Sequence, residues 1–393
     1  VIPLAVLYGN RAKDIKSFLK PICDELKELE KKPLRVFRNG EYITEANVYC
    51  LGVASDLMEA SKLMNHSGHQ GLYGCKWCKS KIHTSDFATR SVANKTFQII
   101  SYCLAEGQHA EDEGKPKSTI RNMFGDFCTF NAHFQLMDEF HLFTNVARLI
   151  HEVVSPPFNS KYKYNGNADT YPFLLKCRSY GPLIKQATDM SRAEIPPQFH
   201  ASWKGINICD RLKGQYRSTD WINWLINIVP TLITPAFMDV DAATALNKLC
   251  HAVKLATQWT ISEEQLTTIR NNIEAFFRFL DACLLQRRIS KTLFRINLHM
   301  LSHIPEFIKA QGSLKAYSTR AMERKIGALK RVMNAARYAG ENAGNIIEIE
   351  NMLSFLQSSG IIDFDAPFAK QSDPQSFRDY PSLDKTKPQL WSP

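Results

Sequence analysis

The 393-residue chain carries 49 Lys and Arg against 39 Asp and Glu, and its net charge of +10 favours a polyanionic partner, either nucleic acid or an acidic membrane surface. Its hydrophobic content of 44% and aromatic content of 11% are those of a globular protein of two or three domains, which excludes general disorder and leaves only the tail after about residue 364 as a disordered segment. No run of 18 apolar residues occurs, so the sequence predicts no membrane span.

The first 66 residues predict a mixed α/β layer. Residues 1–9 form an apolar run that predicts a buried strand, and the apolar spacing over 14–31 predicts a helix with a kink at Pro21. A turn is predicted at 38–40, followed by a strand over 46–54 that leads to Asp56. The segment after Asp56 predicts a short helix, and the resulting order of strand, helix, strand and acid favours an α/β arrangement.

The remainder is predicted to be mostly helical. Helical periodicity is clearest at 134–154, 241–258, 262–287, 290–310, 318–338 and 345–358. The helix at 318–338 is distinguished by its charge, because residues 311–340 contain seven Lys or Arg and a single acid, Glu323. Such a helix can turn one carboxylate inward while its basic side chains face phosphates.

One pair among the ten cysteines is close in sequence, Cys75-x-x-Cys78, which is typical of reduced thiols with one metal site and not of a secreted disulfide framework. His299 and His303, at positions i and i+4, place two imidazoles on one helix face and complete a ligand set for tetrahedral zinc. Chance spacing and a redox dithiol are the other interpretations, although the flanking residues lack the strand-to-helix entry of a redox motif. Local alternatives for the second half of the site are His66, His69 and His83.

Two acids are candidates for metal-dependent chemistry. Asp56 follows a predicted strand at the end where α/β sheets place functional groups, and Glu323 lies in the basic helix. Converging carboxylates can hold a pair of Mg²⁺ ions that activate water and stabilise the leaving 3′-oxygen of a phosphodiester. The alternative interpretation is structural, with Asp56 as the cap of the next helix and Glu323 as an ion-paired surface residue.

Four blocks of the sequence resemble the catalytic region of the CACTA-type (En/Spm-like) DDE transposases, which are related to the Transib transposases and the catalytic subunit of the V(D)J recombinase. The resemblance spans roughly residues 1–345. Its blocks are KDIKSFLKPICDELKEL, GVASDLMEASKLMNHSGHQGLYGCKWC, MDEFHLFTNVARLI and LHMLSHIPEFIKAQGSLKAYSTRAMERKIGALKRV.

This resemblance implies an α/β fold with a ribonuclease H-like core interrupted by a large, mostly α-helical insertion. Residues 1–66 would form the N-terminal part of the core, without its first strands. The zinc-stapled insertion would span 67–311, and residues 312–345 would form the C-terminal catalytic helix of the core. A closing helix and flexible tail would occupy 346–393.

The resemblance also implies roles for individual residues. Asp56 and Glu323 match the second and third acids of the DDE triad, which holds two catalytic Mg²⁺ ions. A structural Zn²⁺ would be held by Cys75, Cys78, His299 and His303. Independently of the resemblance, the clustering of positive charge predicts that DNA phosphates are contacted by residues of the basic helix, namely Arg320, Arg324, Lys330, Arg331 and Arg337.

Some residues do not fit this pattern or have two interpretations. The first catalytic Asp is missing, because the chain is expected to begin at the third core strand, and Asp14 and Asp24 lie on a predicted helix that cannot replace it. The fragment is therefore expected to be inactive unless the full-length protein supplies that strand. Asp138 is expected to be structural, with membership of the active site beside His141 as the alternative. Core packing is expected for Trp221 and Trp224, with stacking on a frayed base as the alternative.

The expected function is metal-dependent DNA strand cleavage and strand transfer in the nucleus, with transposon ends and target DNA as partners and a homodimer as a further possibility. One alternative is a domesticated or decayed transposase that binds DNA or a protein without cutting. A second is a helical interaction protein with a structural zinc, in which the acids are incidental.

Overall fold

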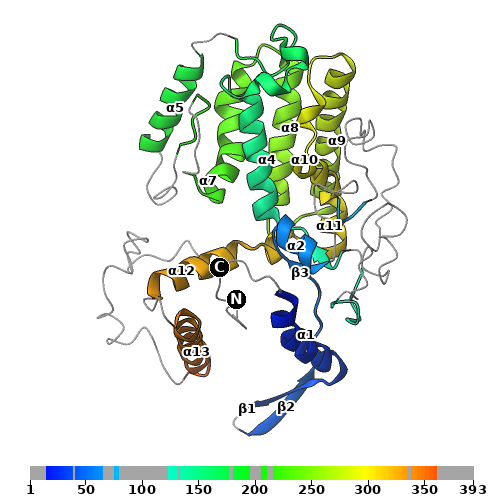
Figure 1. Cartoon of the computed structure of the whole chain (residues 1–393), viewed down its shortest axis with the longest axis vertical. Helices are drawn as coiled ribbons and strands as arrows, with labels where there is room; N and C mark the ends of the chain where they lie inside the picture. The colour runs from blue at the N-terminus through cyan, green and yellow to red at the C-terminus, as the bar shows by residue number, and fades with distance from the viewer. Residues whose placement is uncertain are drawn as a thin grey trace. The chain divides into compact units, whose positions relative to one another are not determined.

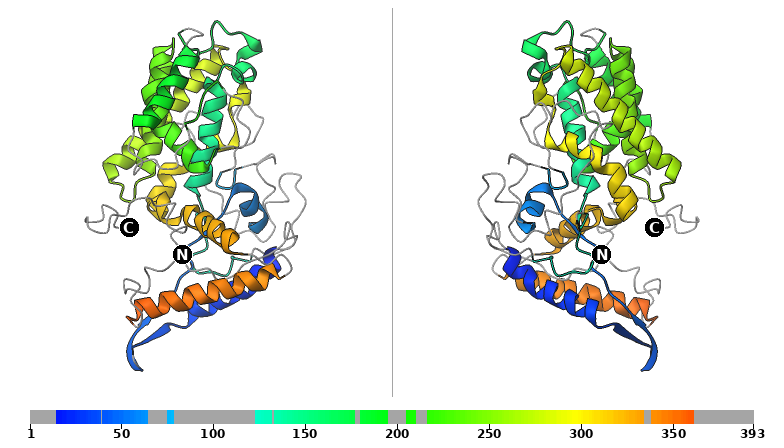
Figure 2. Two further views of the ribbon diagram at one scale, coloured as in Figure 1. Left: turned by 90° about the vertical axis from the view of Figure 1, so that its left-hand side faces the viewer. Right: turned by 90° about the vertical axis from the view of Figure 1, so that its right-hand side faces the viewer.

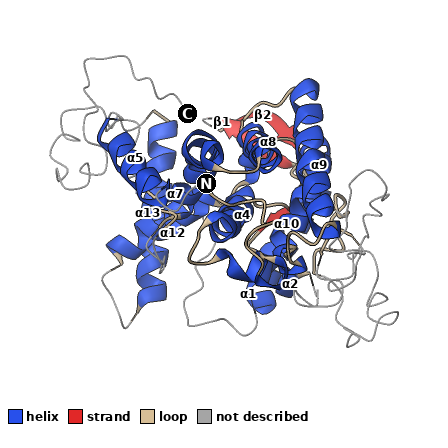
Figure 3. Ribbon diagram, turned by 90° about the horizontal axis from the view of Figure 1, so that it is seen from above, coloured by secondary structure: helices blue, strands red, loops and turns tan. Residues whose placement is uncertain are grey.

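The computed structural model describes residues 15–38, 40–64, 75–78, 123–131, 133–176, 180–194, 205–209, 216–333 and 338–360. Helices make up 66% of these residues, and the strands are few and short (Figure 3). The predicted strand at 1–9 lies outside the described residues. In the described part of the chain, no helix is both long and apolar enough to cross a membrane.

The chain divides into two compact units. The large unit comprises Lys13–Met190 and Lys204–Arg320, and the small unit contains Ala321–Pro393 together with Val1–Ala12 and Ser191–Trp203. The boundaries predicted at residues 66, 311 and 345 remain predictions.

The large unit starts with a helix and a β-hairpin (Figure 1). Helix α1 (Ile15–Lys31) continues through Pro21, close to the predicted range. Strands β1 (Leu34–Arg38) and β2 (Glu41–Ala46) pair antiparallel, and Gly40, with φ of +85°, supplies the left-handed residue of the turn between them. The hairpin extends from the end of α1, and nearly all of its residues are exposed (Figure 2).

The strand predicted over 46–54 is wrong for most of its length. Only β3 (Val53–Ala54) forms, and it pairs in parallel with β4 (Gln135–Leu136). Upstream, the backbone of Cys50 bonds side chains instead of a neighbouring strand: its amide donates to Glu30 at 3.2 Å and its carbonyl accepts from the Thr129 hydroxyl. The backbone groups of Cys50 are thus bonded to side chains and not to a strand. The described strands form only two two-stranded sheets, and no ribonuclease H-like sheet is evident among the described residues.

Gly52 immediately precedes β3 and permits its close approach to the segment before β4. A Cβ atom at this position would lie 2.7 Å from the Phe134 carbonyl oxygen and 2.7 Å from the Leu136 side chain. We therefore expect Gly52→Ala to destabilise the protein by about 1–3 kcal/mol, measured by urea unfolding, because backbone has to move. Gly327 is the matched control, since a Cβ there meets nothing within 4 Å; Gly327→Ala should not destabilise, and equal losses in both variants would contradict this explanation.

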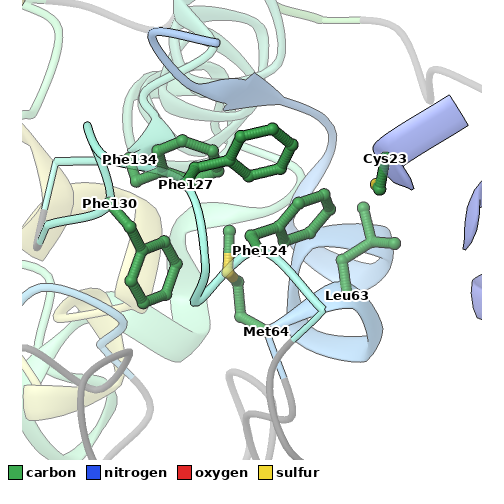
Figure 4. Close-up of a cluster of buried hydrophobic side chains, with 7 residues drawn as sticks. All are labelled: Cys23, Leu63, Met64, Phe124, Phe127, Phe130 and Phe134. Carbon is green, nitrogen blue, oxygen red and sulfur yellow. The ribbon is translucent and has the colours of Figure 1, made fainter. Parts of the chain in front are cut away.

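A cluster of buried side chains joins α1 to the segment before β4. The next helix, α2 (Leu57–Leu63), contributes its end, and four phenylalanines come from 124–134. The rings of Phe130 and Phe134 meet edge to face with centroids 5.2 Å apart. Figure 4 shows the members together: Cys23, Leu63, Met64, Phe124, Phe127, Phe130 and Phe134. The cluster fixes the stretch that contains β3 against α1.

The body of the large unit is a bundle of helices (Figures 1 and 2). Helices α8 and α9 are joined by a short loop and pack along each other, while α4 packs against α7 and α10. The predicted helical ranges are confirmed here with shifts of a few residues, with two exceptions: α4 begins five residues later, and the range 290–310 is divided into short helical pieces instead of one helix. The bundle's main helices are α4 (Glu139–Val154), α5 (Tyr180–Glu194), α7 (Ser218–Asn223), the π-helical η5 (Trp224–Ile233), α8 (Val240–Ala256), α9 (Glu263–Leu285), α10 (Ile296–Met300) and α11 (Ile304–Gln311).

Trp221 and Trp224 are packing residues of this bundle. They are 5% and 0% exposed, and their rings meet edge to face with centroids 6.2 Å apart. His151 of α4 packs against both rings. The predicted core role is confirmed, because neither ring offers an open face on which a base could stack.

The small unit contains most of α12 (Arg320–Val332) and all of α13 (Ala339–Ser358). Helix α12 lies within the predicted range 318–338, and α13 covers the predicted range 345–358 but starts six residues earlier. Lys325 of α12 forms an ion pair with Glu350 of α13. Arg337, a predicted DNA contact, lies outside the described residues.

Candidate metal centre

Four metal-ligating side chains from distant parts of the large unit meet in its interior. Cys75 and Cys78 lie in one short segment, His299 lies in α10, and His303 ends the 3₁₀ turn between α10 and α11. The ligand atoms of all four lie within 4.8 Å of one another, and all four residues are buried. The predicted convergence is confirmed, and the group can hold a metal ion such as zinc.

Three of the separations between ligand atoms are close to those around a tetrahedral zinc ion. Cys75 Sγ lies 3.4 Å from His303 Nε2, Cys78 Sγ lies 3.1 Å from His299 Nε2, and the two Nε2 atoms are 3.3 Å apart. A zinc ion with Zn–N of about 2.0–2.1 Å and Zn–S of about 2.3 Å separates its ligand atoms by roughly 3.3–3.8 Å. These cysteine–histidine pairs are 221 and 228 residues apart in sequence, so an ion at this position would cross-link the large unit.

The two thiols have opposite protonation tendencies. Burial raises the pKa of Cys75. The hydrogen bond from Cys75 lowers the pKa of Cys78 and outweighs the opposing effect of burial, and His299 and His303 lower it further. The pair therefore favours a thiolate at Cys78, which is the protonation state that binds metal.

Trp77, between the two cysteines, fixes their segment against the rest of the unit. It is 2% exposed, its indole nitrogen donates to the Gln135 carbonyl at 3.1 Å, and its ring packs edge to face on Phe307 and His303. Because Gln135 lies in β4, which pairs with β3, Trp77 connects the candidate ligands to the strand that leads to Asp56. Sequence reasoning missed this role; the signal was a large aromatic residue inside the C-x-x-C pair.

The other histidines that the sequence offers as partners of Cys75 and Cys78 are not among the residues that the structure describes. His66, His69 and His83 all lie outside the described residues. Within the described ranges, no further group of three or more His, Cys, Asp or Glu converges in this way.

Comparison with known proteins assigns no family: no family model matches this sequence, and no curated protein matches it significantly. The chemistry of the centre is therefore inferred from its residues and their geometry.

Asp56 caps a helix and also borders a small pocket. Its Oδ1 accepts a hydrogen bond from the Glu59 amide at 2.8 Å, which confirms the capping interpretation, and its side chain is exposed. The pocket brings it together with residues of the candidate metal segment and of α4 and α10, including Lys76, Trp77, Asp138, His141, Asn145 and Asn297. Capping uses one carboxylate oxygen, so the geometry is compatible with a second role for the other.

Asp138 is fully engaged in hydrogen bonds at the start of α4. It accepts from the amides of Phe140 and His141, from the His141 ring, and from the amide and hydroxyl of Thr319 at 2.9 and 2.7 Å. Burial alone would raise the pKa of Asp138, but the bonds from His141 and Thr319 outweigh it and lower the pKa overall. These contacts support the structural interpretation of Asp138.

Glu323 and the basic residues lie on α12. Glu323 is exposed in its first turn, and Arg324, Lys330 and Arg331 are exposed farther along. Glu323 belongs to the small unit and Asp56 to the large one, and no magnesium site is shown among the described residues.

Arg320 has a different environment from the other basic residues of α12. Its guanidinium forms two hydrogen bonds to the buried carboxylate of Glu139, at 2.7 and 3.0 Å. This pairing is not the open phosphate contact predicted for Arg320, because the charge already balances an acid within the fold.

Proposed function

We propose that this chain is part of a CACTA-type DDE transposase whose candidate centre holds a structural Zn²⁺. The convergence of Cys75, Cys78, His299 and His303 carries the proposal. The resemblance named these four residues as one ligand set, although its two halves are separated by more than half of the chain.

The proposed activity is cleavage of DNA at a transposon end followed by transfer of the freed 3′ end to target DNA. Asp56 and Glu323 are the proposed catalytic acids, and bound Mg²⁺ would supply activation of water and stabilisation of the leaving 3′-oxygen. The exposed Arg324, Lys330 and Arg331 are proposed to bind DNA phosphates, which would make affinity fall steeply with salt. A ribonuclease H-like core and a nuclear location belong to the same proposal.

The surroundings of Asp56 support a functional link with the metal. Trp77 donates a hydrogen bond to β4, β4 pairs with β3, and Asp56 follows β3 after one intervening residue. A bound zinc would thus hold the proposed catalytic acid in place without touching substrate, which is the usual contribution of a structural metal site.

Cleavage tests the proposal directly. In the full-length protein that contains this chain, Asp56→Asn and Glu323→Gln are each expected to lower nicking of supercoiled plasmid in Mg²⁺ by about 10³-fold or more, because each removes a metal-binding charge. Asparagine is a good helix cap, so Asp56→Asn should keep α2 folded. Zinc content and binding to a double-stranded oligonucleotide should be unchanged.

Glu59→Gln is the matched control, since Glu59 lies in the same helix turn and, among the described residues, its carboxylate forms an ion pair with Lys62 at the surface. It should nick like the parent protein. Full nicking by Asp56→Asn would refute the assignment of the catalytic acids.

A second candidate is a non-catalytic DNA- or protein-binding module with a structural zinc. The observation that favours it is that Asp56 already serves as a helix cap and no carboxylate cluster is found within the described ranges. The same experiment separates the two functions, because this module would bind the oligonucleotide or a protein partner while the parent protein itself fails to nick.

A further inference from the structure

Two adjacent acids at the start of α4 bind two adjacent residues at the start of α12. Asp138 accepts hydrogen bonds from the amide and hydroxyl of Thr319, and Glu139 accepts two from the Arg320 guanidinium. The partners are 181 residues apart in sequence. All four residues belong to the large unit, which ends at Arg320.

The Glu139–Arg320 pair is a desolvated ion pair. The Glu139 side chain is 0% exposed and that of Arg320 is 28% exposed. The guanidinium also lies over the Phe140 ring, 5.1 Å from its centroid. A buried carboxylate needs its cation, because removing one partner leaves an uncompensated charge in a low-dielectric interior. If Arg320 moved to a DNA phosphate, the buried Glu139 carboxylate would lose its cation and the fold would be destabilised.

The Glu139–Arg320 ion pair lies at the N-terminal end of α12, where a helix is least stable by itself. The first turn of a helix lacks partners for its amides and tends to fray. Here the residue before α12, Thr319, and its first residue, Arg320, are both held by side chains of α4. Glu323 follows in that first turn, three residues after Arg320.

We propose that Asp138, Glu139, Thr319 and Arg320 form a latch that holds the start of α12 and makes Glu139 and Arg320 positioning residues for Glu323. The inference rests on the proposed function for the role of Glu323. The latch itself is a property of the fold, and its effect on α12 can be measured without any DNA.

Hydrogen exchange followed by mass spectrometry measures the latch in the zinc-loaded protein. Glu139→Gln and Arg320→Gln are each expected to speed exchange of peptides covering 319–328 by about tenfold or more, because release of the latch opens the first turns of α12. The double variant should exchange no faster than the single ones, since both remove the same interaction. Exchange of α8 and α9 and the zinc content should stay unchanged, which shows that the variants are folded.

Glu274→Gln is the control, because Glu274 forms a 3.0 Å ion pair with Arg278 within α9 and takes no part in the latch. It should leave exchange at 319–328 unchanged. Parent-like exchange at 319–328 in both latch variants would overturn the proposal.

DNA assays distinguish a failed latch from a failed function. With an active parent protein, both latch variants should lose nicking to a similar extent, with unchanged affinity and unchanged salt dependence for a double-stranded oligonucleotide. If Arg320→Gln alone weakens binding and flattens the salt dependence, Arg320 is a phosphate contact and the latch is refuted. If the parent protein does not nick DNA, the exchange result still decides whether the latch exists.

Discussion

Replacing Cys75 and Cys78 together by serine is expected to abolish metal binding and to destabilise the protein more than any single substitution in its core. The reason is that the centre joins residues far apart in sequence: Cys78 and His299 are separated by 221 residues, and Cys75 and His303 by 228. The cysteines and the histidines also come from different elements of the fold. Structural zinc contributes about 10–16 kcal/mol in zinc-finger peptides, which is comparable to the roughly 5–15 kcal/mol total stability of a typical domain. We expect about one zinc per chain in the parent protein and none in the double variant, measured by elemental analysis, with a much lower thermal midpoint.

A chelator should reproduce the effect in the parent protein and add nothing in the variant. Cys128→Ser provides the control, because Cys128 is an exposed free cysteine outside the ligand set. It should retain zinc and its thermal midpoint. Retention of zinc by the double variant would show that the metal binds elsewhere, and the assignment of these four ligands would be wrong.

Trp77→Ala is expected to destabilise the protein by about 3–5 kcal/mol, because it removes a fully buried indole from the packing around the candidate ligands. It also leaves the Gln135 carbonyl without its donor and removes the ring that packs on His303. Loss of this support should weaken metal affinity by about tenfold or more. Denaturant unfolding measures the first effect and competition with a chromophoric chelator the second.

Trp77→Phe separates packing from hydrogen bonding. It keeps an aromatic ring but removes the indole donor, so it should cost less than Trp77→Ala. Trp259→Ala is the control for loss of a tryptophan as such: this side chain is 63% exposed and contacts Lys315 by a cation–π interaction, so the cost should be below about 1 kcal/mol. Similar losses for Trp77→Ala and Trp259→Ala would contradict the proposed support of the metal centre.

Helices, which depend on local spacing, could be predicted better from the sequence than strands, which depend on pairing with distant segments. The helical ranges follow from apolar periodicity and are largely confirmed, whereas the strand predicted over 46–54 is wrong. Its apolar, β-branched residues do favour a strand, but Glu30 and Thr129 take the hydrogen bonds of Cys50. The local sequence around Cys50 cannot predict hydrogen bonds to side chains that lie 20 and 79 residues away.

The candidate site shows the same division. The ligand set could be named in advance, because C-x-x-C spacing and an i, i+4 His pair are each recognisable as half of a tetrahedral site and the family resemblance joins them. The DNA role predicted for Arg320 came from the clustering of positive charge in 311–340. The structure shows that this arginine balances Glu139, a buried acid 181 residues away, so counting charges along a helix could not separate it from its exposed neighbours.

The sequence by itself determined most of the helical segments, the four side chains that have metal-binding chemistry, and the helix in which positive charge is clustered around a single acid. These are properties of residue type and of spacing within a few turns of chain. Only the tertiary structure decided that the four ligands meet, that Trp77 connects them to the strand before Asp56, and that the start of α12 is held by the two acids that begin α4. Such contacts depend on how distant segments pack, and the free energy that selects them comes from burial and pairing across the whole unit, which no local pattern encodes.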